Sequence, residues 1–204
     1  KIGADKYDTD NLKLGKNFTF SAEDLDQAFV GQGKKTSAIV ADVVSQSNSM
    51  GARGVMFFAS TIEHAEEVLA SLPAYNSALV TGETPKAERK RIIAEYKAQK
   101  IKYLVNVSVL TTGFDAPHTD VVAILRATES ASLLSQIIGR GLRLFEGKEF
   151  CLILDYAGNI QKFYPDGDLF NPQIQSFGEK KPIKEDFHCE LCNSVNTFSL
   201  RPNP

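Results

Sequence analysis

The chain has 204 residues, which is enough for one α/β domain and a smaller appendage. Hydrophobic residues make up 43% of it and charged residues 24%, as in an ordinary soluble globular protein. The formal net charge of −2 argues against a protein whose whole surface binds nucleic acid, although a local basic stripe remains compatible with it.

No apolar run approaches the roughly 18 residues that a membrane helix needs, so we expect no membrane partner. The first residues, Lys1 to Lys6, are charged, contain no methionine and lack the apolar region of a signal peptide, which suggests a piece of a longer protein. Three cysteines argue against a disulfide scaffold and fit a reducing cytoplasm, which is the location that we predict.

Helical and strand patterns alternate along the chain. Residues 1–33 are polar and mixed, apart from a short amphipathic stretch from Ala22 to Phe29, and we expect a connecting segment there. The helical period then predicts helices over 36–48, 62–72, 86–98 and 130–140. Apolar runs predict strands over 55–59, 78–80, 103–105, 121–125 and 150–154. Continuous apolar strands with helices between them indicate an α/β fold, with a parallel sheet covered on both faces.

The end of the chain has a different composition. From Gly158 onward Pro, Gly, Asp and Asn accumulate, so we expect one α/β lobe over 34–160 and an irregular, extended tail over 161–204. Cys189 and Cys192 have the spacing of half a zinc site, and His188 adjoins them. The alternatives are the start of a module that binds Zn²⁺ in a longer protein and a tail with two free thiols. Cys151, inside the last predicted strand, is most simply a small core residue.

The most informative segment runs from Gln136 to Arg143. On a helix Gln136, Arg140 and Arg143 share one face, while Leu134, Ile137 and Ile138 occupy the opposite face and anchor the helix to the sheet. Two guanidinium groups on a fixed platform suit the charge that builds on a transferring phosphoryl group. We expect Gly139 and Gly141 to add flexibility near the second arginine. The alternative is a solvated basic helix face.

A second informative segment, Val109 to Pro117, follows a predicted strand. Ligands of open parallel sheets bind outside the carboxyl ends of the strands, so we expect the segment to lie there. Gly113 allows a close approach of the backbone, and Thr111 and Thr112 offer hydroxyls to phosphate oxygens. Asp115 can accept from a ribose hydroxyl or orient an arginine. The alternative is an ordinary loop with a turn glycine and a capping aspartate.

In this order and spacing the two segments resemble motifs V and VI of superfamily 2 helicases. Phe57 to Thr61 resembles motif IV, and Leu79 to Gly82 resembles the strand and loop that follow it in the same lobe. The resemblance covers about residues 34–160 and looks most like the branch that contains bacterial RadD-type DNA repair helicases. It implies a RecA-like lobe, the second of two in an ATP-driven motor on nucleic acid, with DNA as the expected partner.

The resemblance also implies residue roles. Arg143 matches the arginine finger, Arg140 its companion at the γ-phosphate, and Gln136 the residue that opens motif VI near the nucleotide. Gly113 and Asp115 match the motif V pair at the ATP cleft. The positions that match contacts to the nucleic-acid backbone are Ser60, Thr61, Thr81, Gly82, Thr111 and Thr112. Val107 departs from the family, because many members carry threonine there for a phosphate contact.

The groups that would hold ATP are missing from the sequence. Gly31 to Thr36 resembles a phosphate-binding loop but lacks its glycine spacing, and we interpret it as the N-terminus of a helix. No acidic box is present for Mg²⁺. We therefore expect an N-terminal RecA-like lobe to hold ATP and Mg²⁺, and this chain alone to be inactive. The alternative is a degenerate, non-enzymatic lobe that binds DNA or protein.

A further group of basic residues is most simply interpreted without a functional role. It consists of Lys86, Arg89, Lys90, Lys97, Lys100 and Lys102, which surround a predicted helix. We expect these side chains to form a solvated helix face.

Overall fold

A computed structural model describes residues 6–15, 17, 19–109 and 114–166, together with the backbone of 183–188 and 195–200. Its contacts divide the chain into two units, Lys1–Gln173 and Ile174–Pro204. The strands of the first unit are β1 (Gly54–Ala59), β2 (Ser77–Val80), β3 (Tyr103–Asn106), β4 (Thr119–Leu125) and β5 (Leu152–Asp155). Its helices are α1 (Ala22–Phe29), α2 (Gly33–Ser49), α3 (Ile62–Ala70), η1 (Ala74–Asn76), α4 (Lys86–Lys97), α5 (Ala131–Gly141) and α6 (Asn159–Phe163).

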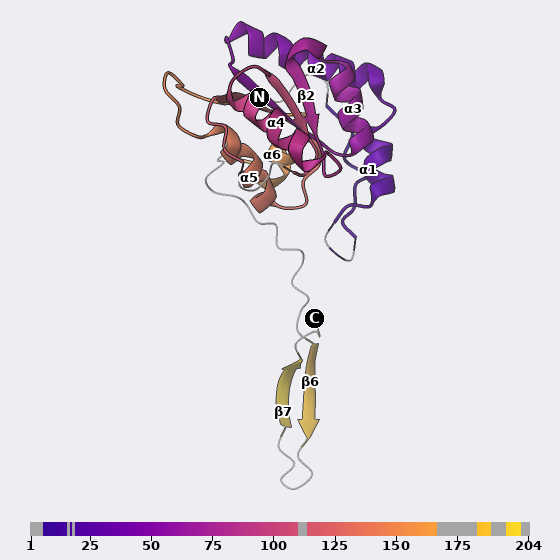
Figure 1. Ribbon diagram of the computed structural model, residues 1–204. Helices are drawn as coiled ribbons and strands as arrows, with labels where there is room; N and C mark the ends of the chain where they lie inside the picture. The colour runs from indigo at the N-terminus through magenta and orange to yellow at the C-terminus, as the bar shows by residue number, and fades with distance from the viewer. Residues whose placement is uncertain are drawn as a thin grey trace. The chain divides into compact units, whose positions relative to one another are not determined.

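The five strands form one sheet in the order β2-β3-β1-β4-β5, and every neighbouring pair is parallel. Alternate side chains of β1 enter two separate cores, with Val55 and Phe57 on one side and Met56 and Phe58 on the other. Helices α1, α2 and α3 close the first core, whereas α4, α5 and α6 close the second (Figure 1). The predicted parallel sheet with helices on both faces is confirmed.

Capping side chains and a glycine with a positive φ mark the residues at which the helices begin. The hydroxyls of Thr61 and Ser130 accept backbone N–H bonds at the starts of α3 and α5, as serine and threonine caps do. Gly31 takes a positive φ of 72°, and α2 begins two residues later at Gly33. The segment that resembles a phosphate-binding loop is therefore the helix N-terminus that we expected.

The chain does not become irregular at Gly158. This residue adopts a left-handed φ of 73° and precedes the short helix α6. The carboxylate of Asp155 accepts the amide N–H of Ile160 at 2.7 Å, and Asn159 accepts the amide of Thr128 at the same distance. Gly, Asp and Asn, which suggested a tail, are here the residues that start a helix and satisfy buried backbone groups.

The N-terminal segment packs against the lobe through Tyr7. Tyr7 is buried, and its amide donates to the carbonyl of Tyr156 at 2.8 Å. Its hydroxyl lies 2.9 Å from Nε2 of His64 and 3.1 Å from the hydroxyl of Thr36. The amide of Ser60 donates to Nδ1 of His64, so the ring proton is on Nε2 and points to Tyr7. The first turn of α3 is thereby joined to the N-terminal segment.

The second unit contains β6 (Ile183–His188) and β7 (Val195–Leu200), an antiparallel pair in which His188 lies opposite Val195. Cys189 and Cys192 fall between these strands in the sequence and outside the described residues. In the described part of the chain, no helix combines the length and the apolar character that crossing a bilayer requires.

His64 gives the fold a testable pH dependence. Burial lowers the pKa of His64 from 6.5 to about 4. Between these values the unfolded chain binds a proton that the folded chain does not, so the free energy of unfolding falls as the pH decreases. From pH 7 to pH 5 we expect His64 to contribute a loss of about 2 kcal/mol.

The measurement is urea unfolding of the wild type and of His64→Gln at both pH values. The carboxylates titrate in both proteins, so the difference between them isolates the histidine. Equal losses in the two proteins would show that His64 is protonated normally in the fold.

Candidate functional site

The loops that follow β1, β2 and β4 lie at one edge of the sheet, because all its strands are parallel. Ser60 follows β1 and is only 9% exposed, yet its Oγ is among the buried polar atoms that have no hydrogen-bond partner in the described part of the chain. Thr61 uses its hydroxyl to cap α3. A buried hydroxyl without a partner is unfavourable, so Ser60 is a polar group at this edge whose hydrogen-bonding capacity the described fold leaves unused.

The loop after β2 is closed by Arg89 of α4. Its Nη2 donates to the carbonyls of Thr81 at 2.9 Å, Gly82 at 3.1 Å and Thr84 at 3.3 Å. Thr81 is buried and accepts the amide of Glu83, whereas Gly82 is exposed at the tip. The expectation of a solvated basic face is therefore wrong for Arg89.

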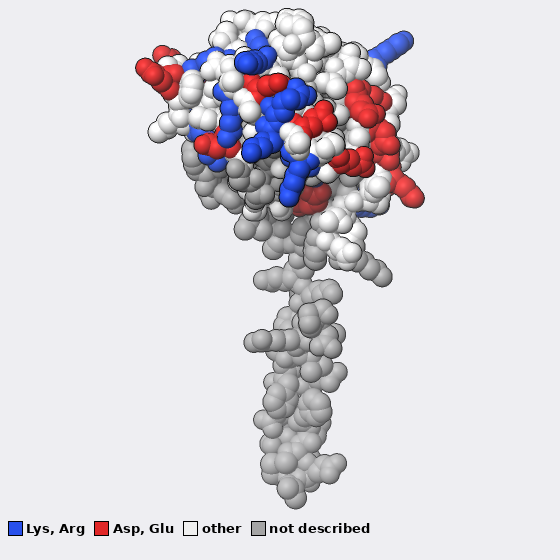
Figure 2. Space-filling view, in the orientation of Figure 1, with Lys and Arg blue, Asp and Glu red and all other residues white. Residues whose placement is uncertain are grey.

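The lysines of α4 do fit that expectation. Lys86, Lys90 and Lys97 are exposed, and Figure 2 shows lysine and arginine side chains gathered in front of the sheet, where α4 lies. Lys97 also lies 6.0 Å from the centre of the Phe114 ring, so the basic face borders the second informative segment.

The residue just before that segment is held by a side chain from the end of β4. Arg126 follows β4, is 8% exposed, and donates through Nη1 to the hydroxyl of Ser108 at 2.7 Å. It also forms an ion pair with Glu129. Ser108 has a positive φ of 55°, which is uncommon for a serine. Leu110, Thr111, Thr112 and Gly113 lie outside the described residues.

Arg140 of α5 and Arg143 both contact the segment that resumes at Phe114. Helix α5 ends at Gly141, so the expectation that Arg143 shares a helix face with Gln136 and Arg140 was wrong. Nη1 of Arg140 donates to the carbonyl of Phe114 at 2.7 Å, and Arg143 forms an ion pair with Asp115. The Arg143 and Asp115 side chains are 39% and 57% exposed, so the pair is open to solvent. Gln136 is exposed, while Leu134, Ile137 and Ile138 are buried as predicted.

Burial and the neighbouring charge of Arg143 lower the pKa of Arg140, and Asp115 acts in the opposite direction. A guanidinium nevertheless keeps its charge at any physiological pH. The site therefore presents two cations beside one exposed carboxylate. Such a group can bind an anion once the carboxylate is displaced or its charge is offset.

The arginine pair does not lie at the carboxyl edge. Because β4 and β5 are parallel, α5 runs back from the carboxyl edge to the amino edge, and its 11 residues span about 16 Å. Asp115 precedes the start of β4 and lies near that amino edge. Our expectation that Asp115 lies outside the carboxyl ends of the strands was therefore wrong, because Asp115 comes just before β4, and β4 runs parallel to its neighbours from the amino edge.

The two glycines near Arg143 were expected to add flexibility, but both lie in α5. They differ from each other in the space around them. Both are helical, Gly139 within α5 and Gly141 as its last residue. A Cβ at Gly139 would meet nothing within 4 Å, but one at Gly141 would lie 2.2 Å from Sγ of Cys151 and 3.0 Å from Cγ2 of Val122. Gly141 is thus the point at which the helix packs directly on the sheet, and it is not a source of flexibility.

The described residues contain no group of three or more His, Cys, Asp or Glu side chains that could hold a metal ion. Sequence reasoning missed Arg53, His64, Arg126 and Lys148 as polar residues that organise the lobe. Arg126 had a signal, because a charged residue directly after an apolar strand stands at the sheet edge. Lys148, in a loop of mixed polar and apolar residues, had none.

A family model described as Helicase conserved C-terminal domain matches residues 35–145. Two yeast proteins assigned as ATP-dependent helicases are similar to the chain. Irc3 of Saccharomyces cerevisiae is 42% identical over 83 residues, which is 41% of this chain and 12% of that protein. Mitochondrial irc3 of Schizosaccharomyces pombe is 39% identical over 109 residues, which is 52% of this chain and 18% of that protein.

Among solved structures, the chain is similar to a fragment of an HsdR subunit of a type I restriction enzyme from Vibrio vulnificus. That likeness has a TM-score of 0.58 and 27% identity, and it covers 68% of this chain and 30% of the other. The Escherichia coli DEAD-box protein SrmB has a TM-score of 0.55 at 18% identity over 67% of this chain and 80% of its own, which shows a shared fold.

The two glycines make a matched pair of tests. Gly141→Ala should destabilise the chain by about 1–3 kcal/mol, because the added methyl group overpacks the contact with Cys151. Gly139→Ala should stabilise it by roughly 0.5–1 kcal/mol, since alanine favours a helix and the space is open. Guanidinium unfolding of the three proteins measures both effects.

A Cys151→Ala change should recover part of the loss in Gly141→Ala by removing the sulfur. If both glycine variants changed stability alike, the close approach at Gly141 would not be the reason for that glycine.

Proposed function

Because the chain belongs to the Helicase conserved C-terminal domain family, we propose that it is the second motor lobe of an ATP-dependent helicase or translocase. The observation that supports this most directly is the pair Arg140 and Arg143, each held against the segment 114–115. The chain spans 12% and 18% of the lengths of the two yeast relatives, and the activity of the whole protein is part of the proposal.

In this proposal an N-terminal RecA-like lobe binds ATP and Mg²⁺, and the present lobe closes over them. Arg143 leaves Asp115 and donates to the γ-phosphate, where charge builds during transfer, and Arg140 assists from the preceding turn. Forked guanidinium donors fixed in place stabilise that charge without reorganisation. Gln136 is exposed on the same helix and reaches the nucleotide, together with Gly113 of the Asp115 segment.

The carboxyl edge of the sheet serves the nucleic acid. Ser60 supplies a buried hydroxyl whose bonding position is open, Thr61 starts α3, and Gly82 exposes its backbone at the loop tip. Thr81, Thr111 and Thr112 complete the set in the proposal. Hydroxyls and amides hold the sugar-phosphate backbone and do not read the bases. Cycles of closure and opening then move these loops along the strand.

We propose DNA as the strand and DNA repair as the setting. The likeness to a restriction-enzyme HsdR subunit at 27% identity supports DNA. Cys189 and Cys192 remain a proposed half-site for Zn²⁺ in the longer protein. Their place in the sequence between two antiparallel strands is compatible with a metal-binding hairpin, but a structural zinc needs four ligands.

The second candidate is a degenerate lobe that binds DNA or protein without driving hydrolysis. Both arginines are present and each has a contact that orients it, which favours the motor. The two candidates differ in whether Arg143 is needed for turnover.

The test is ATP hydrolysis by the full-length protein with Arg143→Ala. We expect kcat to fall by about 10³ to 10⁵, while ATP binding stays within a few fold, because the contact forms mainly in the transition state. Arg143→Lys should recover little, since a point charge does not replace the fork. Arg91→Ala is the matched control, because Arg91 is an exposed arginine of α4 that pairs with Glu95.

The 204-residue chain alone should not hydrolyse ATP. Near-normal kcat in Arg143→Ala would favour the non-enzymatic lobe. Turnover by the isolated chain that depended on Arg143 would overturn the division of labour between two lobes.

Ser60 tests the nucleic-acid edge. Ser60→Ala should leave the unfolding free energy unchanged or higher, because it removes a buried hydroxyl without a partner. DNA-stimulated ATPase of the full-length protein should weaken to a similar degree with every DNA sequence. Ser77→Ala is the control, since the Ser77 hydroxyl donates to the carbonyl of Pro73 inside the fold. Unaltered DNA stimulation in Ser60→Ala would remove Ser60 from the contact set.

A further inference from the structure

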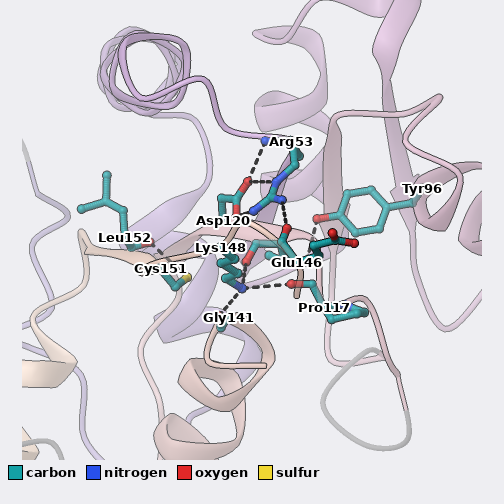
Figure 3. Close-up of polar contacts among 10 residues, drawn as sticks. Arg53, Tyr96, Pro117, Asp120, Gly141, Glu146, Lys148, Cys151 and Leu152 are labelled. Carbon is teal, nitrogen blue, oxygen red and sulfur yellow. Dashed lines mark hydrogen bonds and ion pairs between the residues drawn. The ribbon is translucent and has the colours of Figure 1, made fainter. Parts of the chain in front are cut away.

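The ammonium of Lys148 binds three backbone carbonyls at the amino edge of the sheet (Figure 3). Nζ donates to Pro117 at 3.0 Å, to Thr119 at 2.6 Å and to Gly141. A lysine ammonium has three N–H donors, so this set uses all of them. Lys148 is only partly exposed, and burial lowers its pKa, which Cys151 and Asp120 counteract.

The three carbonyls belong to the segments that present the arginine pair. Pro117 lies two residues after Asp115, and Thr119 begins β4. Gly141 ends α5, between Arg140 and Arg143. Arg140 and Arg143 join these segments through Phe114 and Asp115, and Lys148 joins them again through Pro117, Thr119 and Gly141. The offset between the Asp115 segment and the end of α5 is therefore fixed at three points.

The turn that carries Lys148 is itself held in place. Arg53 binds both carboxylate oxygens of Asp120, at 2.9 and 2.8 Å, and donates through Nη1 to the carbonyl of Glu146 at 2.9 Å. Its guanidinium lies 4.9 Å from the centre of the Phe145 ring. The amide of Lys148 closes the turn on the carbonyl of Phe145 at 3.0 Å. Lys148 thus acts from a rigid base and not from a free loop.

We infer that Lys148 is a positioning residue for the arginine pair. Its ammonium sets where the end of α5 stands relative to Pro117 and Thr119, and so sets the pose in which Arg143 meets Asp115. A misplacement of about 1 Å can lower the rate of a reaction by roughly a hundredfold. The consequence for hydrolysis rests on the proposed function, whereas the consequence for the pose of Arg143 does not.

The pose is measured on the 204-residue chain by the ¹⁵N chemical shift of the Arg143 Nε. We expect Lys148→Met, which keeps the apolar stem, to move this signal in the direction given by Asp115→Asn. Lys148→Arg should move it less. Lys34→Met is the control, because Lys34 is exposed at the start of α2. A folded Lys148→Met protein with an unmoved Arg143 signal would overturn the inference, even if its melting temperature fell.

The consequence is measured on the full-length protein at a temperature at which every variant is folded. Lys148→Met should lower kcat by about tenfold to a hundredfold and change KM for ATP by no more than a few fold. In an Arg143→Ala background it should cause no further loss. If Lys148→Met does not fold, Lys148→Gln replaces it, because the amide retains two donor hydrogens. Wild-type kcat in the folded variant would overturn the positioning role.

The proposed function and the positioning role of Lys148 can be disproved separately. If the wild-type full-length protein did not hydrolyse ATP, the proposed function would fall, and the Arg143 shift would still decide whether Lys148 sets the pose. If ATPase were normal in the wild type and equally lowered by Lys148→Met with and without Arg143, Lys148 would act through another group.

Discussion

Strands β1 and β4 have no side that faces solvent, and the placement of the functional side chains depends on that constraint. All six residues of β1 and all seven of β4 are buried. Burial on both faces requires a layer of helices on each side, and parallel strands then require connections that return across the sheet. The loops after the strands are thereby gathered at one edge. The end of α5 and the start of β4 meet at the other, where Gly141, Lys148 and Asp120 lie.

Most of the buried polar groups around these loops find hydrogen-bond partners inside the lobe. The group that finds none is therefore informative. Asp155, Asn159 and Thr128 bind one another or nearby amides around the start of α6. Arg89 and Arg126 tie loops through carbonyls and hydroxyls. Ser60 Oγ, at the same edge, has no such partner in the described part of the chain. Asp115 and Arg143 are paired but exposed, which suits a contact that must open.

The elements that could be predicted from the sequence are those whose pattern reflects burial. The five strands and the helices between them follow from apolar runs and the helical period, and Ser130 and Thr61 cap helices in the described chain. The site residues came from a motif resemblance. That Asp115 orients an arginine was one of two anticipated roles, whereas the bond from Arg140 to the carbonyl of Phe114 could not be anticipated from spacing. Lys148 binds backbone carbonyls. Every residue has one, so no residue type in the sequence indicates this contact. Tyr7 and His64 meet across 57 positions, and no local pattern indicates such a pair. The helix after Gly158 was missed because its five residues are too few to show a period.

Helix α5 is fixed at both ends, and this limits how related chains can differ in length. Ser130 caps one end, and Gly141 rests on Cys151 at the other with no room for a side chain. Adding a single residue between them would turn everything beyond it by about 100° and carry the arginines away from residues 114 and 115. Insertions and deletions should therefore be absent from 131–141. At Leu144, which is 93% exposed, related chains should differ in residue type and not in length, because Phe145 to Lys148 are held against the lobe.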